Sequence, residues 1–466
     1  MTNQIKKVGV IGAGTMGAGI AGQVANAGVE VWLLDLPSEG ENVNSLAAKG
    51  LERLKDPDMP GLMSKEAESL IRIGNTRDHF HQLEDCDWIA EAVVERLDIK
   101  QALYQKLNES CKESTIITSN TSTIPISLLT KGMPKKFCER FAITHFFNPV
   151  RFMRLLELVR GEFTRDEVID TLDLFSEKIL GKGVVSCQDT PGFLANRVGV
   201  FAIQCALHKA FEYKLSPTEA DAFFGRPLGL PKTGVFGLYD LIGIDLMADV
   251  VKSLVSILPE NDAFHKYSSQ IKFMSKMIAN GQTGNKNEKG FYKQIGDERQ
   301  VIDLSNGSYG PHERLKTPLL EEAEKIGISF IIKDTSPYGL YIWDVISETL
   351  CYAASLVPEV TDDLTQIDDA MKLGYNWVQG PFELLDEIGI KYFVDRLQAD
   401  GKDVPEFLLK GINNKFYINS KSGLSSLSPS GNLKPIIRPD GVLRFSEVRQ
   451  TLKAINSNES ASWFEY

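Results

Sequence analysis

Residues 6–17 read KKVGVIGAGTMG, and this stretch decides the fold of the first part of the chain. The apolar run over 6–11 predicts a buried parallel strand, and the glycines that follow predict a tight turn into a helix over Met16–Ala27. A second strand over 29–34 (VEVWLL) ends at Asp35. Strand, glycine turn, helix and strand form a βαβ unit, which is typical of a mostly parallel sheet covered by helices.

The turn fits the pattern G-x-G-x-x-G through Gly12, Ala13, Gly14, Thr15, Met16 and Gly17. The pattern alone is weak, but here it joins a strand to a helix and stands 18 residues before Asp35. In that context the turn predicts a dinucleotide site at the N-terminus of the helix, where free N–H groups favour phosphate. The alternative is a glycine turn that binds nothing. Because a carboxylate accepts hydrogen bonds from ribose hydroxyls and repels a 2′-phosphate, Asp35 favours NAD over NADP.

Composition excludes several classes of protein. The chain has 466 residues, 43% of them hydrophobic, which suggests about three domains at ~150 residues each. A net charge of −11 argues against a nucleic-acid binder, and we expect no membrane span because no apolar run approaches ~20 residues. Six scattered cysteines argue against a zinc site and fit a reducing compartment. The first residues lead straight into a strand, so we expect no signal peptide and a cytoplasmic protein.

Strand-like runs alternate with helical stretches until about Cys187, after which long amphipathic helices follow. Further strands are expected over 88–94, 115–119, 141–145 and 155–159. A helical motif also occurs twice, as GVFGLYDLIGI over 234–244 and as GPFELLDEIGI over 380–390. The shared pattern favours an internal duplication over a chance similarity of amphipathic helices. We expect a Rossmann-type α/β domain over 1–188, helical copy 1 over 189–300, a linker over 301–335, helical copy 2 over 336–412 and a polar tail over 413–466.

Two side chains are candidates for acid–base chemistry. His145 ends a predicted strand in THFFNP, where open α/β sheets bind ligands, and an imidazole can accept a proton near neutral pH. Glu157 lies in the apolar strand LLELV, and a carboxylate there needs a partner. Pairing would fix the tautomer of the imidazole. From spacing alone, a catalytic base and a structural histidine are equally supported.

Two further positions could contact substrate. Ser122 belongs to SNTS, which follows a strand, so its hydroxyl could hold a nicotinamide or a substrate oxygen; the alternative is a helix N-cap. Asn196, in DTPGFLANR, begins the helical region, and its amide could reach across the cleft to a substrate carbonyl.

Together the motifs VGVIGAGTMG, EAVVE, SNTS, HFFNP, LLELVRG, DTPGFLANR and GLYDLIGI resemble the L-3-hydroxyacyl-CoA dehydrogenase family over residues 5 to about 400. The resemblance implies NAD-dependent oxidation of a (3S)-3-hydroxyacyl-CoA to a 3-oxoacyl-CoA in fatty-acid β-oxidation. It implies His145 as the base, Glu157 as its partner, and Ser122 and Asn196 as active-site residues. It further implies cofactor contacts by Asp35, Glu95, Lys100, Ser122, Asn148 and Lys286, besides the glycine turn. No metal is implied.

The two helical copies resemble those of the longer family members, and copy 2 lacks the Asn-Arg pair, which predicts a non-catalytic module. An acyl-CoA is the expected substrate. Expected partners are a second copy of the chain, an enoyl-CoA hydratase or a thiolase. Three alternatives stay open: a short-chain 3-hydroxybutyryl-CoA dehydrogenase, a dehydrogenase of free hydroxy acids, and a non-catalytic NAD-binding relative.

Overall fold

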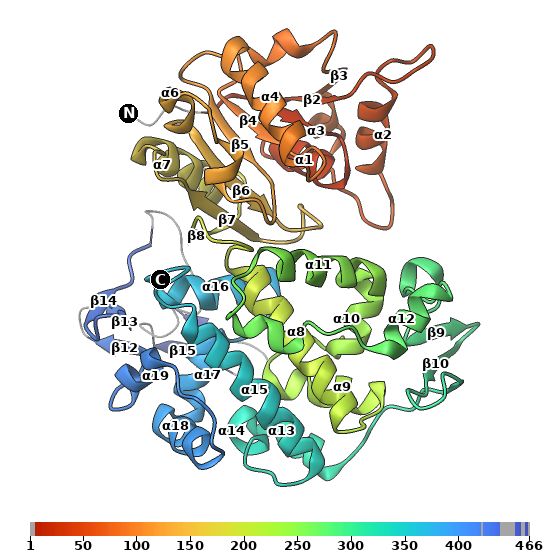
Figure 1. Ribbon diagram of the computed structural model, residues 1–466, viewed down its shortest axis with the longest axis vertical. Coiled ribbons are helices and arrows are strands. Elements are labelled where there is room, and N and C mark those ends of the chain that lie inside the picture. Colours follow the sequence, from red (N-terminus) through yellow and green to blue (C-terminus); the bar gives the residue numbers. More distant parts are fainter. Residues whose placement is uncertain (1–4, 421–422, 439–452, 458–461, 465–466) are drawn as a thin grey trace.

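The computed structural model describes residues 5–420, 423–438, 453–457 and 462–464, with a sheet domain above a larger helical part (Figure 1). Within these residues, eight strands form one sheet in the order β3-β2-β1-β4-β5-β6-β7-β8. Strands β1 to β6 are parallel, β7 is antiparallel to β6, and β8 is parallel to β7. The order reverses at β1, the point where doubly wound sheets leave a crevice for ligand. The bounds are β1 Lys7–Ile11, β2 Glu30–Asp35, β3 Ile71–Asn75, β4 Trp88–Glu91, β5 Ile116–Ser119, β6 Phe141–Phe146, β7 Leu155–Arg160 and β8 Gly183–Gln188.

Helices cover the sheet and bury both of its faces. Neighbouring residues of one strand enter different cores: Val10 packs in one apolar cluster and Ile11 in another, and the same holds for Ile89 and Ala90. Burial on both sides explains why the central strands read as continuous apolar runs. The helices of this domain are α1 Thr15–Asn26, α2 Ser45–Arg53, α3 Lys65–Ser69, α4 Leu97–Ser110, α5 Ile126–Leu129, α6 Lys135–Cys138 and α7 Asp166–Leu174.

The expected Rossmann-type sheet is confirmed, with two strands added. Sequence periodicity did not predict β3 and β8, which form the two edges of the sheet. Edge strands carry polar residues such as Arg72 and Ser186, both exposed, and so lose the apolar run that marks the centre. The predicted domain boundary near Gln188 coincides with the end of β8.

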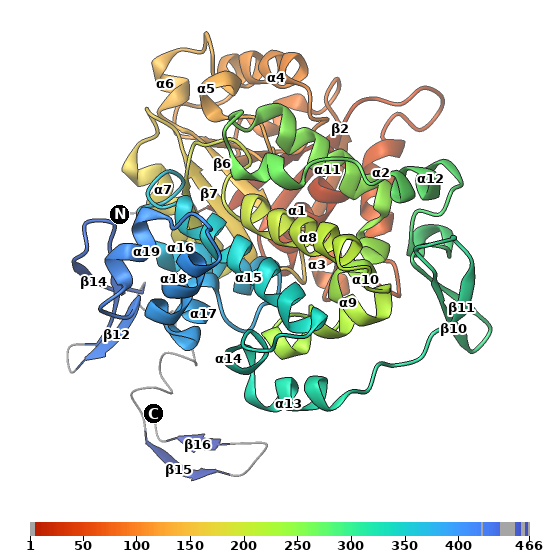
Figure 2. The same ribbon diagram turned by 60° about the horizontal axis from the view of Figure 1, so that its bottom comes forward.

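The helical part has two halves that meet along α8 and α15, which pack against each other (Figure 2). The first half holds α8 Ala195–Glu212, α9 Pro217–Phe223, α10 Gly234–Ile242, α11 Ile244–Ile257, α12 Lys272–Ala279 and the strands β9 Tyr292–Ile295, β10 Glu298–Ile302 and β11 Tyr309–Pro311. The second half holds α15 Pro337–Ser355, α16 Leu364–Gly374, α17 Pro381–Ile388, α18 Ile390–Ala399, α19 Glu406–Gly411 and the strands β12 Tyr417–Ser420, β13 Gly423–Leu427 and β14 Leu433–Pro435. Among the residues described, no helix is both long and apolar enough to cross a bilayer.

Two segments differ from their expected character. The stretch 301–335, expected as linker, contains α13 Pro318–Ile326 and α14 Ile328–Ile331. The stretch 413–466, expected as polar tail, contains β12 to β14, which pair as a three-stranded antiparallel sheet, and the pair β15 Ala454–Ser457 and β16 Ser462–Phe464. The other residues of that stretch lie partly outside the described ranges. Short strands rich in Ser, Asn and Pro have too little apolar alternation to be recognised in the sequence.

An aspartate makes the same hydrogen bonds in each half. The Asp221 carboxylate accepts from the backbone N–H groups of Phe236 and Gly237 at 2.7 and 3.0 Å, and from the Tyr292 hydroxyl at 2.8 Å. In the second half, the Asp368 carboxylate is the corresponding acceptor. It accepts from the backbone N–H groups of Phe382 and Glu383 at 2.8 and 3.0 Å, and from the Tyr417 hydroxyl at 2.8 Å. The duplication expected from the sequence stays a prediction, and these matching contacts support it.

Each of these aspartates is expected to stabilise its own half. Asp221→Ala leaves three donors without an acceptor, which is expected to cost on the order of 3 kcal/mol of unfolding free energy, and Asp368→Ala a similar amount. Urea unfolding followed by circular dichroism measures both, with Asp249→Ala on the exposed face of α11 as the control. A midpoint equal to wild type in either variant would contradict the prediction.

Candidate active site

A histidine and a glutamate face each other across two antiparallel strands. His145 on β6 is the register partner of Glu157 on β7, and the distance from His145 Nδ1 to Glu157 Oε2 is 2.6 Å. Both side chains are buried, with exposed fractions of 5% and 0%. With Nδ1–H donating to the carboxylate, the lone pair of Nε2 is left to accept a proton. The structure therefore brings together the two residues that the sequence put forward as an acid–base pair.

The second carboxylate oxygen of Glu157 caps the first helix of the helical part. Oε1 accepts hydrogen bonds from the backbone N–H groups of Leu194 at 3.0 Å and Ala195 at 2.7 Å, where α8 begins. The positive end of the helix dipole favours the charged carboxylate at this place. The Cys187 thiol lies 3.8 Å from Oε1, and burial together with the Glu157 charge raises its pKa, so that the thiol stays neutral. Glu157 thus connects the imidazole to the start of α8.

The turn before α8 is strained in a way that serves this contact. Phe193 has a φ of +50°, in the left-handed region that favours glycine, and it follows Gly192 with a φ of +74°. The reversal directs the next two N–H groups toward Glu157, and the Phe193 ring packs 5.8 Å from the His145 ring, centroid to centroid. Strained non-glycine residues persist where the surroundings hold them, often at functional sites. The sequence did not indicate Phe193.

Asn196 lies in the first turn of α8, next to the residue that binds Glu157. It is half-buried, whereas its neighbours Ala195 and Arg197 are buried. The Tyr375 hydroxyl donates a hydrogen bond to its Oδ1 at 3.3 Å. Asn196 therefore lies one residue from a group that binds Glu157, and its contact with the substrate stays a prediction.

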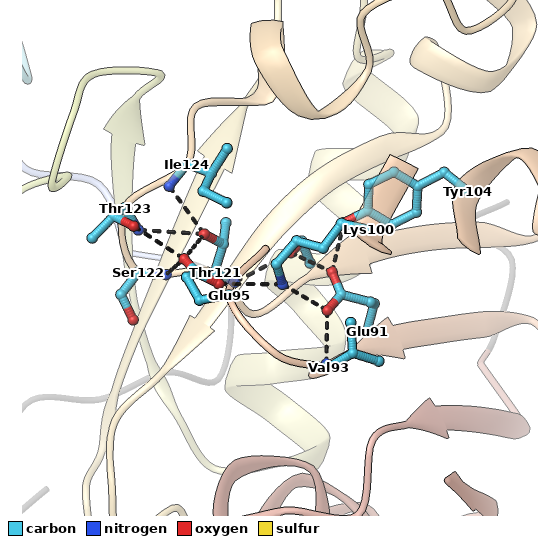
Figure 3. A network of polar contacts seen from close by, with 10 residues as sticks. Glu91, Val93, Glu95, Lys100, Tyr104, Thr121, Ser122, Thr123 and Ile124 are labelled. Atoms are coloured by element: carbon cyan, nitrogen blue, oxygen red, sulfur yellow. Dashed lines mark hydrogen bonds and ion pairs between the residues drawn. The ribbon is translucent and has the colours of Figure 1, made fainter. Parts of the chain in front are cut away.

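Ser122 belongs to a network centred on Glu95 (Figure 3). The Glu95 Oε1 atom accepts hydrogen bonds from the Thr121 hydroxyl, from the Thr123 hydroxyl at 3.1 Å and from the Ser122 N–H at 3.3 Å. The Ser122 hydroxyl itself points away from the carboxylate in Figure 3. Glu95 thereby orders the loop that carries Ser122. Contact of Glu95 or Ser122 with the cofactor stays a prediction.

Lys100 is less accessible than its expected role suggests. Its side chain is 1% exposed, and Nζ lies 2.7 Å from Glu91 Oε1 and 3.3 Å from Glu95 Oε2. In this position its single positive charge is shared between two carboxylates, and it supports the Glu95 network. A direct contact of Lys100 with the cofactor stays a prediction.

Glu91 is a site-supporting residue that the sequence interpretation missed. This fully buried carboxylate ends β4 and also accepts from the Tyr104 hydroxyl at 2.5 Å, the Ser119 hydroxyl at 2.7 Å and the Val93 N–H at 2.8 Å. Burial and the Glu91 charge raise the pKa of Tyr104, which stays a donor. A lone carboxylate in an apolar strand indicated Glu157, and the same reasoning applied to WIAE would have indicated Glu91.

The glycine turn fits a dinucleotide. A Cβ on Gly12 would lie 2.4 Å from the Ala92 carbonyl oxygen, and one on Gly17 would lie 1.7 Å from the Gly12 carbonyl oxygen, so both positions exclude a side chain. A Cβ on Gly14 would meet nothing within 4 Å, which is the open approach that a pyrophosphate needs. Asp35 ends β2 beside the turn and accepts from the Ala13 N–H at 2.6 Å. The residues present therefore match the groups that hold a dinucleotide.

The two remaining cofactor candidates come from other segments of the chain. Asn148 is exposed just beyond β6. Lys286 belongs to the helical part, where its Nζ binds the Asp245 carboxylate at 2.6 and 2.7 Å in the first turn of α11. Contact of either residue with the cofactor stays a prediction.

Fold and site together define a dehydrogenase-like protein, in which a dinucleotide-binding α/β domain presents a His–Glu pair to a helical domain. Comparison with known families agrees with this. Residues 7–190 match the model of the NAD-binding domain of 3-hydroxyacyl-CoA dehydrogenase, and residues 192–294 match the model of its C-terminal domain. The chain therefore belongs to the 3-hydroxyacyl-CoA dehydrogenase family and has its NAD-binding domain.

Individual relatives show how far the similarity extends. A protein of Rickettsia prowazekii named as a fatty acid oxidation complex trifunctional enzyme is 41% identical, over 83% of this chain and 53% of the relative. The mitochondrial hydroxyacyl-coenzyme A dehydrogenase of Sus scrofa is 33% identical, over 62% of this chain and 91% of the relative. The chain thus spans about half the length of the trifunctional relative.

Solved structures share the fold. The crystal structure of 3-hydroxybutyryl-CoA dehydrogenase from Escherichia coli has a TM-score of 0.66 at 23% identity, over 88% of this chain and 98% of that chain. That of (S)-3-hydroxybutyryl-CoA dehydrogenase from Ralstonia eutropha has a TM-score of 0.50 at 30% identity, over 62% and 98%. The first of these structures extends the shared fold to most of the chain.

Proposed function

We propose that this chain oxidises the 3-hydroxyl group of (3S)-3-hydroxyacyl-CoA to give 3-oxoacyl-CoA, with NAD as the acceptor, in fatty-acid β-oxidation. The observation that carries the proposal is the buried pair of His145 and Glu157, held at 2.6 Å. His145 lies near the carboxyl end of β6, at the sheet edge where the parallel strand β1 leads into the glycine turn. A structural histidine would need no carboxylate fixed by the start of a helix. Here Glu157 is held on both oxygens, which orients the imidazole.

Each residue of the site has one task. Nε2 of His145 takes the proton of the substrate hydroxyl as the C–H bond at C3 breaks, a step worth roughly 10²–10⁴ in rate. NAD, when bound, accepts the hydride from C3. Glu157 stabilises the imidazolium that forms, and Ser122 and Asn196 hold the substrate oxygens. The proton on His145 then passes to water, so the alcohol has lost one hydride and one proton in total.

Cellular setting and partners belong to the same proposal. The proposal includes a cytoplasmic location and association with an enoyl-CoA hydratase or a thiolase. The name of the Rickettsia prowazekii relative, which describes a trifunctional enzyme of a fatty acid oxidation complex, supports association with further activities of fatty acid oxidation. A homodimer is the alternative arrangement, and size-exclusion chromatography with light scattering distinguishes a dimer from a monomer.

The proposal is tested by the substrate range of the purified protein. NADH oxidation is expected with acetoacetyl-CoA and longer 3-oxoacyl-CoAs, at a kcat/KM at least ~100-fold above that for free acetoacetate, because the bound CoA contributes binding energy to the reacting geometry. NADPH is expected to be a poor substitute because Asp35 repels its 2′-phosphate. Binding of NADH without turnover of any 3-oxoacyl-CoA would identify a non-catalytic relative. A rate that falls steeply beyond four carbons would favour the short-chain alternative.

A further inference from the structure

A tyrosine of the second helical half touches the active site. Tyr375 directly follows α16, is half-buried and lies 179 positions from Asn196 in the sequence, yet its hydroxyl donates to Asn196 Oδ1 at 3.3 Å. We propose that Tyr375 is a positioning residue: its hydrogen bond to Oδ1 orients the Asn196 amide so that the NH₂ group points toward the substrate. The proposal rests on the function proposed above and gives the second half a role in the chemistry.

The Tyr375 ring reaches α8 through a gap in the helix surface. A Cβ on Gly199 would lie 2.1 Å from Tyr375 Cζ, so this approach requires glycine at 199. Residues 196 and 199 are three apart in α8 and therefore share one face of the helix. Gly199 thus receives the ring, and Asn196 receives the hydroxyl one turn earlier.

The end of α16 is fixed against the sheet domain. A Cβ on Gly183 would lie 2.5 Å from Leu373 Cδ1, and a Cβ on Gly374 would lie 2.5 Å from Leu155 Cδ2, so in each pair a leucine side chain packs directly against a glycine backbone. The Ser186 N–H also donates to the Gln366 side chain at 2.8 Å. These contacts place Tyr375 before any substrate binds, and a preorganised donor costs little at the moment of reaction.

The first turn of α8 is tied to the second half a second time. Arg197, 1% exposed, binds Glu359 through Nη1 at 2.6 Å and the Tyr352 hydroxyl through Nε at 3.2 Å. Both partners belong to α15 or the loop after it. Side chains of the second half thereby bind both Asn196 and the adjacent Arg197.

The direction of the hydrogen bond decides what Asn196 can do. Burial and the charge of Glu157 raise the pKa of Tyr375, so the hydroxyl stays protonated and donates. With Oδ1 occupied by this donor, the exposed side of the amide offers N–H groups, which bind a carbonyl or alkoxide oxygen. That is the polarity needed by the oxygen on C3 of a 3-oxoacyl-CoA, and an inverted amide would present an acceptor to it.

A double-mutant cycle tests the proposal. Tyr375→Phe keeps the ring against Gly199 and removes only the hydroxyl, so we expect kcat with acetoacetyl-CoA to fall about fivefold to tenfold, as for one neutral hydrogen bond, with the Kd for NADH unchanged. In an Asn196→Ala background the same substitution is expected to have no further effect, because Tyr375 acts through Asn196. An equal loss in both backgrounds would overturn the proposal.

Tyr341→Phe is the matched control. The Tyr341 hydroxyl also reaches from the second half to α8, where it donates to the Ala206 carbonyl oxygen at 3.2 Å, far along the helix from Asn196. It is expected to lower thermal stability without changing kcat. A loss of kcat equal to that of Tyr375→Phe would show a general loosening of the interface and overturn the proposal.

A readout without turnover separates this proposal from the proposed function. If wild type oxidises no NADH with any 3-oxoacyl-CoA, the proposed function fails, but a crystal structure of Tyr375→Phe still reports on Asn196. A rotated Asn196 amide in that variant supports the positioning role. An amide that keeps its wild-type rotamer and hydrogen-bond direction overturns it.

Discussion

Replacing His145 with alanine is expected to lower kcat for acetoacetyl-CoA reduction by roughly 1,000-fold, within the range for loss of a general acid–base group. In the direction of reduction, the imidazolium supplies the proton that the new hydroxyl needs. The side chain is buried against Phe147 and Phe193, and water that fills the space left by alanine is a far weaker acid at neutral pH. Initial rates of NADH oxidation at 340 nm measure the effect.

Two controls accompany this variant. The Kd for NADH, measured by fluorescence, should equal that of wild type because the glycine turn and Asp35 are untouched. His81→Ala, an exposed histidine of the same domain, should retain full activity. If His145→Ala keeps more than about a tenth of the wild-type kcat, the group that moves the proton is another one, since loss of a true acid–base group costs at least ~10²-fold.

Glu157→Gln is expected to lower kcat by about 10³–10⁴-fold, as when the carboxylate that orients a catalytic histidine becomes an amide. The glutamine can keep its carbonyl oxygen on the N–H groups of Leu194 and Ala195, where Glu157 Oε1 now lies. Its NH₂ group then faces His145 Nδ1, which must accept. The imidazole proton moves to Nε2, and in that tautomer the ring cannot take the hydroxyl proton of the substrate in the direction of oxidation. In the direction of reduction the donor is the imidazolium, which needs a proton on both nitrogens, and the NH₂ group facing Nδ1 opposes that form.

The pair can be tested as a unit. In a His145→Ala background, Glu157→Gln should lower kcat little further, because the carboxylate acts through the imidazole. A full additional loss would show that Glu157 acts independently, for example by placing α8 alone. Thermal unfolding of the single variant checks that α8 remains docked, since the helix keeps an acceptor at its first N–H groups.

Local signals predicted the sheet domain and the core of the site. The glycine turn over 12–17 and Asp35 could be recognised because they lie within one short stretch of sequence. The conformation of the turn also depends on its own residues rather than on distant ones. The pair His145 and Glu157 could be proposed because each interrupts or ends an apolar strand. The structure added that the two stand opposite each other in register, a fact that depends on how β6 and β7 pair.

Other features could not be predicted from the sequence because they depend on contacts between segments that are distant along the chain. Nothing in the residues around Tyr375 marks it, since an aromatic residue at a helix end is usually core. The sequence implied Lys100 only as a cofactor contact, and its ion pair with the buried Glu91 became visible once the fold placed the two side by side. The strands β12 to β14 consist largely of polar residues whose alternation is too weak to detect in the sequence. Carboxylates of distant helices hold that sheet in place, since Asp368 accepts from the Tyr417 hydroxyl and Asp386 from the Tyr417 N–H.

The covalent linkage between the two helical halves has a consequence for how the protein behaves in the test tube. Because Tyr341 pairs with Ala206 and Tyr375 with Asn196 inside one chain, diluting the sample cannot separate these partners. A tether keeps the effective local concentration of the second half in the millimolar range, far above any working enzyme concentration. Specific activity should therefore stay constant from micromolar down to picomolar protein, with no lag after dilution.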